Sequence, residues 1–198
     1  MKKVFYLLTL SVLIASTSFA QDDKKTTKEG TSLSVGLEAG LPLGDFGKGS
    51  SFGIGGSVKA GLPIFDGGAV TLSAGYMSFM AKTVSGVKGN ATGIIPIKAG
   101  LRFRISEGFY GEPQLGVSMV NAKYLSVDQN GNPTTVSANK SYFTYAAGVG
   151  YMMKQIDIGV RYEAFSQKVA AIDQNFNLTT KSVATGFVGL RIAYNFGL

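Results

Sequence analysis

The residue types that most often carry catalysis are absent from this chain. Its 198 residues include no His and no Cys, which removes the usual general base, the commonest metal ligand and the thiol nucleophile. A carboxylate-only or Ser–Lys mechanism remains, and Glu112 and Glu163 are the carboxylates that could form such a pair. The competing interpretation is that both are salt-bridged structural residues. The composition therefore argues against most hydrolases and metalloenzymes.

Two short motifs have the residue types of ligand-binding loops but not their context. Residues 53–56, GIGG, are similar to part of a dinucleotide loop, yet they lie within an alternating segment rather than between a strand and a helix. Residues 128–133, DQNGNP, begin like a calcium loop, but Gly131 comes early and no bidentate Glu follows at the required spacing. We therefore predict no catalytic residue, no cofactor and no metal site.

The dominant pattern in the chain is an alternation of apolar and polar residues with a period of two, which is typical of β-strands. In the last alternating segment, Leu190 and Ile192 share an apolar face and Arg191 lies on the opposite one. Eight segments show the pattern: 33–41, 52–62, 70–76, 95–105, 109–119, 143–151, 156–164 and 184–196. We expect strands of roughly 10 to 13 residues there, enough for a tilted strand to cross a bilayer, which takes about 9–11 residues.

The connections between these segments alternate between short and long. Tight turns are predicted at 66–68, 106–108 and 154–155, and longer loops near 44–51, 82–92, 123–141 and 167–183. Short turns on one side and long loops on the other are typical of outer-membrane barrels. Pro96 and Pro113 fall inside predicted strands, where each removes a ladder donor and predicts a bulge or a local break.

The charged residues indicate which face points inward. A soluble barrel is apolar inside and polar outside, whereas a membrane barrel inverts this arrangement. On the less apolar faces, Gly and small polar residues dilute the charges, unlike the dense charge of a solvated sheet. We therefore predict an all-β fold, an eight-stranded antiparallel up-and-down transmembrane β-barrel with an apolar exterior and a charged interior, rather than a soluble sandwich. The predicted lumen charges are Glu38, Lys59, Lys98, Arg102, Arg104, Glu112, Asp157, Arg161, Glu163 and Arg191.

These lumen charges are predicted to form a salt-bridged plug. An isolated buried charge is costly, so the four acids and six bases must pair. A guanidinium can bind two carboxylates through forked hydrogen bonds, which makes four arginines the expected hubs: Arg102, Arg104, Arg161 and Arg191. An eight-stranded interior is narrow enough for such side chains to fill it.

The N-terminus has the features of an export signal. Lys2 and Lys3 precede a short apolar run, and small residues at Ser18 and Ala20 predict cleavage after residue 20. Residues 21–30 carry three acids and three bases with no apolar residue, which predicts a polar periplasmic leader. The barrel domain is expected over residues 31–198.

The chain resembles the small outer-membrane β-barrel family of OmpA/OmpX-type barrels, often labelled porin-family proteins. The resemblance includes the ending GLRIAYNF, which is similar to the assembly signal of such barrels at four positions: Gly189, Ile192, Tyr194 and Phe196. Gly197 and Leu198 depart from it, because many members end at the aromatic residue. The resemblance implies a monomer in the outer membrane of a Gram-negative bacterium. Its implied partners are outer-membrane lipid, lipopolysaccharide and the barrel-assembly machinery, and not nucleic acid.

The expected role is structural, or a surface interaction through the long loops, without enzymatic activity. Seven lysines against three aspartates give these loops a net charge of +4, and a basic rim suits the phosphates of lipopolysaccharide. A narrow porin for small solutes is the alternative, and a His-independent outer-membrane enzyme is the more distant one. The residues do not identify an extracellular ligand.

Overall fold

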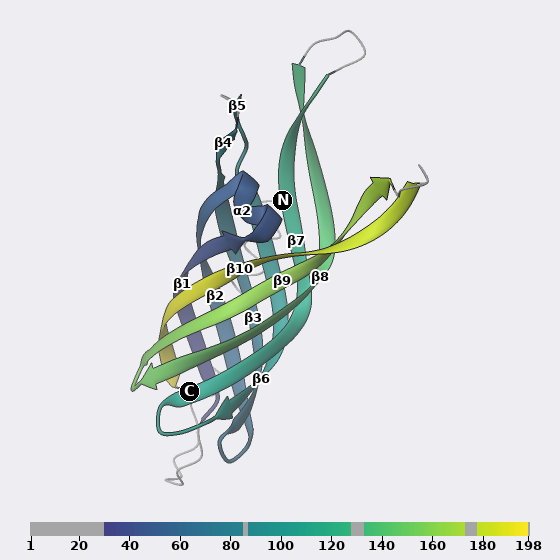
Figure 1. Cartoon of the computed structure of the whole chain (residues 1–198). Coiled ribbons are helices and arrows are strands. Elements are labelled where there is room, and N and C mark those ends of the chain that lie inside the picture. The colour runs from purple at the N-terminus through teal and green to yellow at the C-terminus, as the bar shows by residue number, and fades with distance from the viewer. Residues whose placement is uncertain (1–29, 85–86, 128–132, 173–177, 198) are drawn as a thin grey trace, which may run out of the picture.

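The structure is a computed structural model that describes residues 30–84, 87–127, 133–172 and 178–197. Eight strands form a closed antiparallel barrel in the order β1-β10-β9-β8-β7-β6-β3-β2 (Figure 1). Their bounds are β1 Ser32–Leu43, β2 Ser50–Phe65, β3 Gly68–Ala81, β6 Thr92–Arg104, β7 Phe109–Val127, β8 Pro133–Met153, β9 Ile156–Ile172 and β10 Leu178–Gly197. The predicted fold class is confirmed. The predicted signal peptide and leader residues 21–29 lie outside the described residues.

The outer face of the barrel is apolar and the inner face is polar. Along β1, Val35 and Leu37 are 49% and 77% exposed, whereas Ser34 and Glu38 are 5% and 7% exposed. The other strands repeat this pattern with outward Leu, Ile, Val, Phe and Tyr side chains. A continuous apolar surface of this kind is unfavourable in water and favourable in hydrocarbon, so the predicted inversion of the barrel is confirmed.

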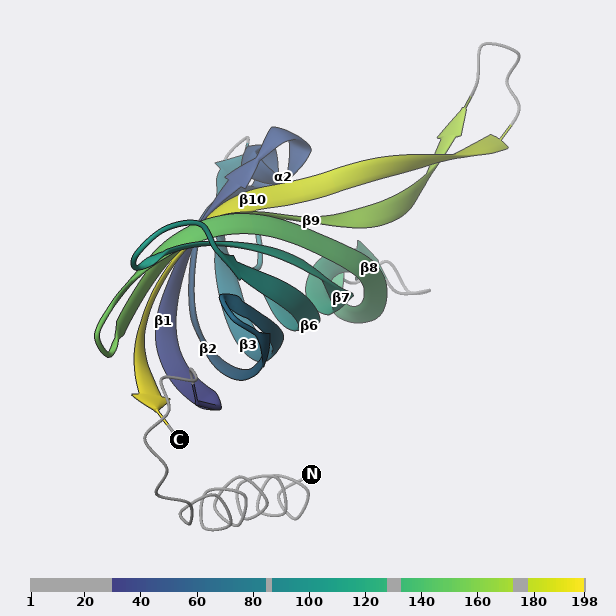
Figure 2. The ribbon, with the colours of Figure 1, turned by 90° about the horizontal axis from the view of Figure 1, so that it is seen from below.

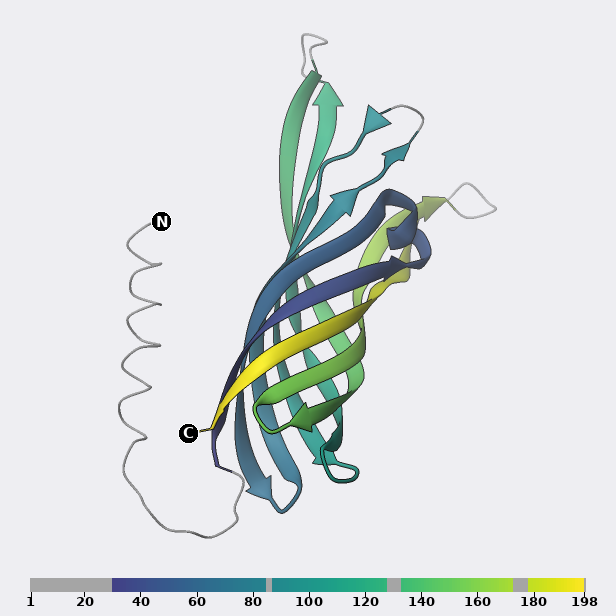
Figure 3. The ribbon, with the colours of Figure 1, turned by 90° about the vertical axis from the view of Figure 1, so that its left-hand side faces the viewer.

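One end of the barrel, which we call the turn end, carries the three short connections and both ends of the described chain (Figure 3). The connections are residues 66–67, 105–108 and 154–155, where the sequence predicted tight turns. Gly67 and Gly108 each have a φ of 78°, a left-handed conformation that favours glycine. Lys154 also adopts a left-handed conformation, with a φ of 52°, although it has a side chain.

At the opposite end of the barrel, which we call the hairpin end, the structure differs from the long loops that the sequence predicted. The barrel pairing of β8 with β9 stops at Thr144↔Phe165, but both strands continue beyond it. β7 and β8 stay paired as far as Val127↔Pro133, and β9 and β10 as far as Leu178↔Ile172. The predicted loops 123–141 and 167–183 are therefore largely hairpins, because each arm satisfies the backbone groups of the other. Figures 1 and 2 show the two hairpins projecting in different directions.

The other two predicted loops also contain secondary structure. The short helix α2, Gly44–Gly49, connects β1 to β2, and β4, Thr83–Val84, pairs with β5, Val87–Lys88. Among the described residues, no helix is long and apolar enough to cross a membrane.

Pro96 and Pro113, the two prolines that the sequence placed inside strands, each interrupt the hydrogen-bonded ladder with one neighbouring strand. Pairing of β3 with β6 runs to Ala74↔Ile97 and resumes at Met77↔Ile94, so Pro96 falls in the gap. Pairing of β6 with β7 skips from Gly100↔Gln114 to Phe103↔Gly111, which leaves out Pro113. The predicted local breaks are confirmed, and they follow from the missing N–H of proline.

Tyrosine rings cover glycines on both faces of the wall. A Cβ at Gly150 would lie 2.3 Å from the Tyr110 ring inside the barrel, and a Cβ at Gly186 would lie 2.7 Å from the Tyr162 hydroxyl on the outside. These glycines leave space that the rings fill, which stabilises strands that contain many glycines.

Candidate functional site

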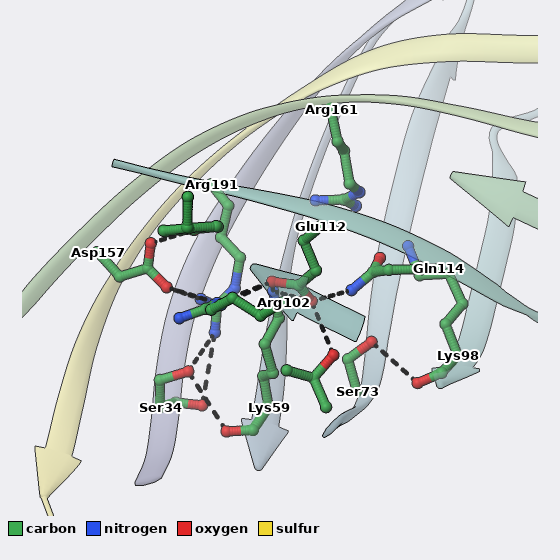
Figure 4. Close-up of polar contacts among 12 residues, drawn as sticks. Ser34, Lys59, Ser73, Lys98, Arg102, Glu112, Gln114, Asp157, Arg161 and Arg191 are labelled. Carbon is green, nitrogen blue, oxygen red and sulfur yellow. Dashed lines mark hydrogen bonds and ion pairs between the residues drawn. The ribbon is translucent and has the colours of Figure 1, made fainter. Parts of the chain in front are cut away.

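Glu112 on β7 is the centre of one group of lumen charges (Figure 4). Lys59 Nζ donates to its carboxylate at 3.0 Å, and Arg102 donates from Nε and Nη2 at 3.0 and 2.8 Å. Thr71 Oγ1 and Gln114 Nε2 donate to the second carboxylate oxygen at 2.9 and 2.6 Å. Two cations and two neutral donors therefore compensate a carboxylate side chain that is only 4% exposed.

Glu163 on β9 is the centre of a second group. Lys98 Nζ donates to Glu163 Oε2, and Arg161 Nε donates to the same oxygen at 2.9 Å. Arg161 Nη2 also donates to Glu38 Oε2 at 2.6 Å. One guanidinium thus connects β9 to β1 across the lumen, which is the forked geometry that arginine provides.

Asp157 and Arg191 extend the first group towards β9 and β10. The Tyr110 hydroxyl donates to Asp157, and Arg102 Nη2 donates to Asp157 Oδ2 at 3.2 Å. Arg191 Nη1 lies 3.5 Å from the same carboxylate oxygen, while Arg191 Nη2 donates to Ser34 Oγ at 3.0 Å. Arg191 Nε is also 3.7 Å from Glu38 Oε1, so the groups adjoin one another.

The structure brings nine of the ten predicted lumen charges into these ion pairs. Arg104, the last residue of β6, is exposed at the turn end, away from the buried groups around Glu112 and Glu163. It is not a buried hub. Alternation places a residue on the inner face but does not say how deep in the barrel it lies.

Sequence reasoning missed an apolar cluster inside the lumen at the hairpin end. This apolar seal consists of Met77, Phe79, Ile94, Val120, Phe165 and Phe187, with Phe46 and Tyr142 packed against it. The Phe79 ring lies 4.8 Å from Phe46 and 5.0 Å from Phe187, and both Phe79 and Phe187 are completely buried. A signal was present, since Phe187 is the large apolar residue on the inward face of the last alternating segment.

Helix α2 lies over the apolar seal and is held by contacts with β3 and its following residue. Phe46 comes from α2, and Lys82 Nζ donates to the Gly47 carbonyl at 2.6 Å. On the exposed side of the helix, the hydrogen bond from Lys48 Nζ lowers the pKa of the Asp45 carboxyl. The apolar seal therefore fills the hairpin end of the lumen, and α2 covers it.

The turn end of the lumen is open. It contains a cavity of about 680 Å³, here the turn-end cavity, whose floor includes Arg102, Tyr110 and Asn195. The cavities among the lumen charges measure only about 20–30 Å³, room for about one water molecule each. The interior is thus open at one end, polar in the middle and apolar at the other end.

The residues considered for catalysis and metal binding are engaged otherwise. Glu112 and Glu163 both accept hydrogen bonds from cations, as expected if they are salt-bridged structural residues rather than a catalytic pair. Within the described part of the chain, no group of three or more His, Cys, Asp or Glu side chains is placed to hold a metal ion. The segment 53–56 lies inside β2, and residues 128–132 are outside the described residues.

The four residues of the predicted assembly signal lie on β10, the strand that closes the barrel with β1. Ile192, Tyr194 and Phe196 point outward and are 51%, 40% and 45% exposed, whereas Gly189 is buried on the inner side. The rings of Tyr194 and Phe196 lie 4.8 Å apart. Their outward position leaves them accessible to lipid or to an insertion partner.

The comparisons with known proteins identify the family. Residues 5–196 match the model of the outer membrane protein beta-barrel domain. The chain belongs to this family. A search of curated proteins found no match.

Solved structures show the same fold at low sequence identity. Ail, the attachment invasion locus protein of Yersinia pestis, is 21% identical with a TM-score of 0.57, covering 85% of this chain and all of Ail. The N-terminal barrel domain of OprF from Pseudomonas aeruginosa is 13% identical with a TM-score of 0.55, and the match covers 83% of this chain and 97% of that domain. OprG of the same organism is 13% identical with a TM-score of 0.51, and the match covers 89% of this chain and all of OprG. These similarities show that the chain shares the fold of small outer-membrane barrels.

Proposed function

We propose that this member of the family is a non-enzymatic barrel that holds two projecting hairpins outside the cell for contact with other surface molecules. The observation that carries the proposal is the continuation of β8 over residues 133–143 and of β9 over 166–172 beyond their last mutual pair. The facing edges of these segments have no partner strand within the described residues. A free strand edge can pair with an extended polypeptide, which gives the hairpins a means of binding.

The chemistry of the hairpin end favours polyanionic partners as well. Lys48 and Lys140 are exposed there, and the sequence adds further lysines in the hairpins. Lipopolysaccharide phosphates and sulfated polysaccharides are the anions that such a rim attracts. Ail is described in complex with the heparin analogue sucrose octasulfate, at 22% identity to this chain and a TM-score of 0.53, which motivates heparin as a probe.

The proposed orientation places the turn end in the periplasm of a Gram-negative bacterium and the hairpin end outside. An even number of strands and short periplasmic turns support this assignment. The absence of native Cys makes labelling clean. Lys140→Cys should react with an impermeant thiol reagent on intact cells, and Lys154→Cys should react only after the outer membrane is broken. The reverse pattern would overturn the orientation.

A binding assay on whole cells tests the surface role. In one variant, a two-residue turn joins Ala122 to Ala138, which are paired in the hairpin, and so removes its outer part. We expect this variant to insert normally and to lose most of the binding of cells to heparin-coated beads. Glu107→Gln, a change at an exposed residue of the turn end, serves as the control and should bind as the wild type. Equal binding by all three would contradict a role for the β7–β8 hairpin.

The closed lumen argues against the narrow porin. Two barriers lie in series along it, the ion pairs around Glu112 and Glu163 and the apolar seal at the hairpin end. An eight-stranded barrel has no spare width for a water-filled path around them. The two barriers support a barrel that anchors rather than conducts.

A further inference from the structure

The ion pairs of the lumen contain one more cation than carboxylate. In the group centred on Glu163, two cations bind two carboxylates. In the group centred on Glu112, three cations share two carboxylates. The cations of this second set are Lys59, Arg102 and Arg191, and the carboxylates are Glu112 and Asp157. The Glu112 group therefore has an excess positive charge inside the barrel.

Neither the neighbouring group nor water removes this excess charge. Arg191 Nε lies 3.7 Å from Glu38 Oε1, but Arg161 already binds Glu38 at 2.6 Å. The side chains of Lys59, Arg102 and Arg191 are only 12%, 15% and 6% exposed. An uncompensated charge is costly where water is scarce, and an opposite charge beside it is attracted strongly. An additional anion beside these cations therefore stabilises the barrel.

A small cavity beside Lys59 and Arg102, which we call the Lys59 cavity, offers a place for such an anion. It measures about 20 Å³, and about 10–15 Å³ is enough for one water molecule. Among the described residues, no carboxylate lines it. The rest of its polar lining consists of three hydroxyls and one amide, from Ser32, Ser34, Thr71 and Asn195. The other two small cavities differ from it, because Glu112 or Glu38 lies in their walls.

Both cations of the Lys59 cavity retain donors for a further acceptor. Lys59 Nζ binds the Glu112 carboxylate at 3.0 Å, and an ammonium group has three N–H donors, so at least one is left. Arg102 binds Glu112 and Asp157 through Nε and Nη2 (Figure 4), and none of these bonds uses Nη1. The cavity also shares Ser32, Gly61, Ala69, Arg102 and Asn195 with the open turn-end cavity. A small ion therefore has a route to it from the turn end.

We propose that the Lys59 cavity binds one halide ion, with chloride as the expected occupant. The ion accepts hydrogen bonds from Lys59 and Arg102 and cancels the excess charge of the Glu112 group. The volume of about 20 Å³ excludes large organic anions. A water molecule also fits this space, but it leaves the charge uncompensated. The site makes the polar barrier of the lumen electrically neutral, and it depends neither on the orientation of the barrel nor on its surface role.

Anomalous X-ray diffraction from crystals of the full chain grown in sodium bromide locates the ion, because bromide replaces chloride and scatters anomalously. We expect a strong bromide peak in the Lys59 cavity of the wild type. Gly61→Ala should remove this peak while leaving every charge in place. A Cβ at Gly61 would lie 2.6 Å from Ser32 Oγ, and both residues line the cavity, so the added methyl group takes up space that the ion needs.

Urea unfolding from lipid vesicles tests whether the ion stabilises the barrel. Chloride replaces gluconate at constant ionic strength, with the same salt on both sides of the membrane. The wild-type midpoint should rise with chloride and reach a plateau, as for a ligand that binds only the folded state. Lys59→Met removes one cation from the Glu112 group, while Arg102 still binds Glu112, and should abolish the rise. The matched control Lys48→Met removes an exposed lysine at the hairpin end and should keep it.

The proposal would be overturned by any of four results. Bromide peaks only beside exposed lysines would mean an adventitious ion only, and density in the cavity without anomalous signal would mean a water molecule. Equal midpoints in chloride and gluconate would show that the ion does not stabilise the barrel. A chloride-dependent rise that persists in Lys59→Met, or that disappears in Lys48→Met as well, would mean a general effect of salt rather than this site.

Discussion

Removing the Glu112 carboxylate should destabilise the barrel strongly. In Glu112→Ala, Lys59 loses the carboxylate it binds at 3.0 Å, whereas Arg102 keeps Asp157 at 3.2 Å. Lys59 and Arg102 side chains are 12% and 15% exposed, so water replaces little of the lost interaction. Breaking a buried ion pair by removing one partner costs about 3–5 kcal/mol. We expect the free energy of unfolding of Glu112→Ala to fall by about that amount.

Urea unfolding from thin phosphatidylcholine vesicles measures this change. Circular dichroism is the suitable signal, because the chain has no Trp. The double variant Lys59→Met, Glu112→Gln removes both charges and should be less destabilised than Glu112→Ala, since no cation is left without its carboxylate. Asp45→Ala breaks an exposed pair with Lys48 outside the barrel and should leave unfolding unchanged.

The reasoning would be refuted by two outcomes of this experiment. Glu112→Ala could be as stable as Asp45→Ala, which would mean that water compensates the lumen cations. Alternatively, the double variant could be as unstable as Glu112→Ala, which would mean that packing of the side chain, rather than its charge, stabilises the barrel.

Three further predictions concern the wall and the lumen. Leu101→Arg, Val160→Arg or Leu190→Arg should each cost about 2–4 kcal/mol of folding into bilayers, and Phe196→Arg near the strand end should cost less; equal tolerance at all four positions would contradict the assignment of the outer face. The wild type should show no steady current steps in planar bilayers, and neither Glu163→Ala nor Phe187→Ala alone should produce them, because the other barrier remains; the combined variant should. Gly150→Val should cost about 1–3 kcal/mol in the same urea assay, because the new side chain overlaps the Tyr110 ring, and Tyr110→Ala should reduce that cost.

The wall of the barrel was predictable from the sequence because it depends on a local rule. Side chains on a strand alternate between its two faces, so Leu190 and Arg191 must lie on opposite faces whichever residues they pair with. The charged positions then identified the inside, and proline chemistry identified the breaks at Pro96 and Pro113.

The parts that were missed depend on contacts between distant residues. Arg161 binds Glu38, 123 positions away, and alternation does not specify strand register. The apolar seal joins Phe46, Phe79, Phe165 and Phe187 from four elements, none of which forms an apolar run of its own. The hairpins were read as loops because their extent depends on how far each pair of strands stays in register.

The seam between β1 and β10 has a consequence for the order of folding. Every other pair in the barrel joins strands that follow one another along the chain, whereas Ser32↔Gly197 joins residues at opposite ends of the described sequence. Neighbouring strands can zip together with short loops to close, but the seam has to bring together ends separated by the whole domain. Until the last strand arrives, β1 and its growing sheet present a free hydrogen-bonding edge, so the polypeptide depends on its surroundings to keep that edge from pairing with another chain.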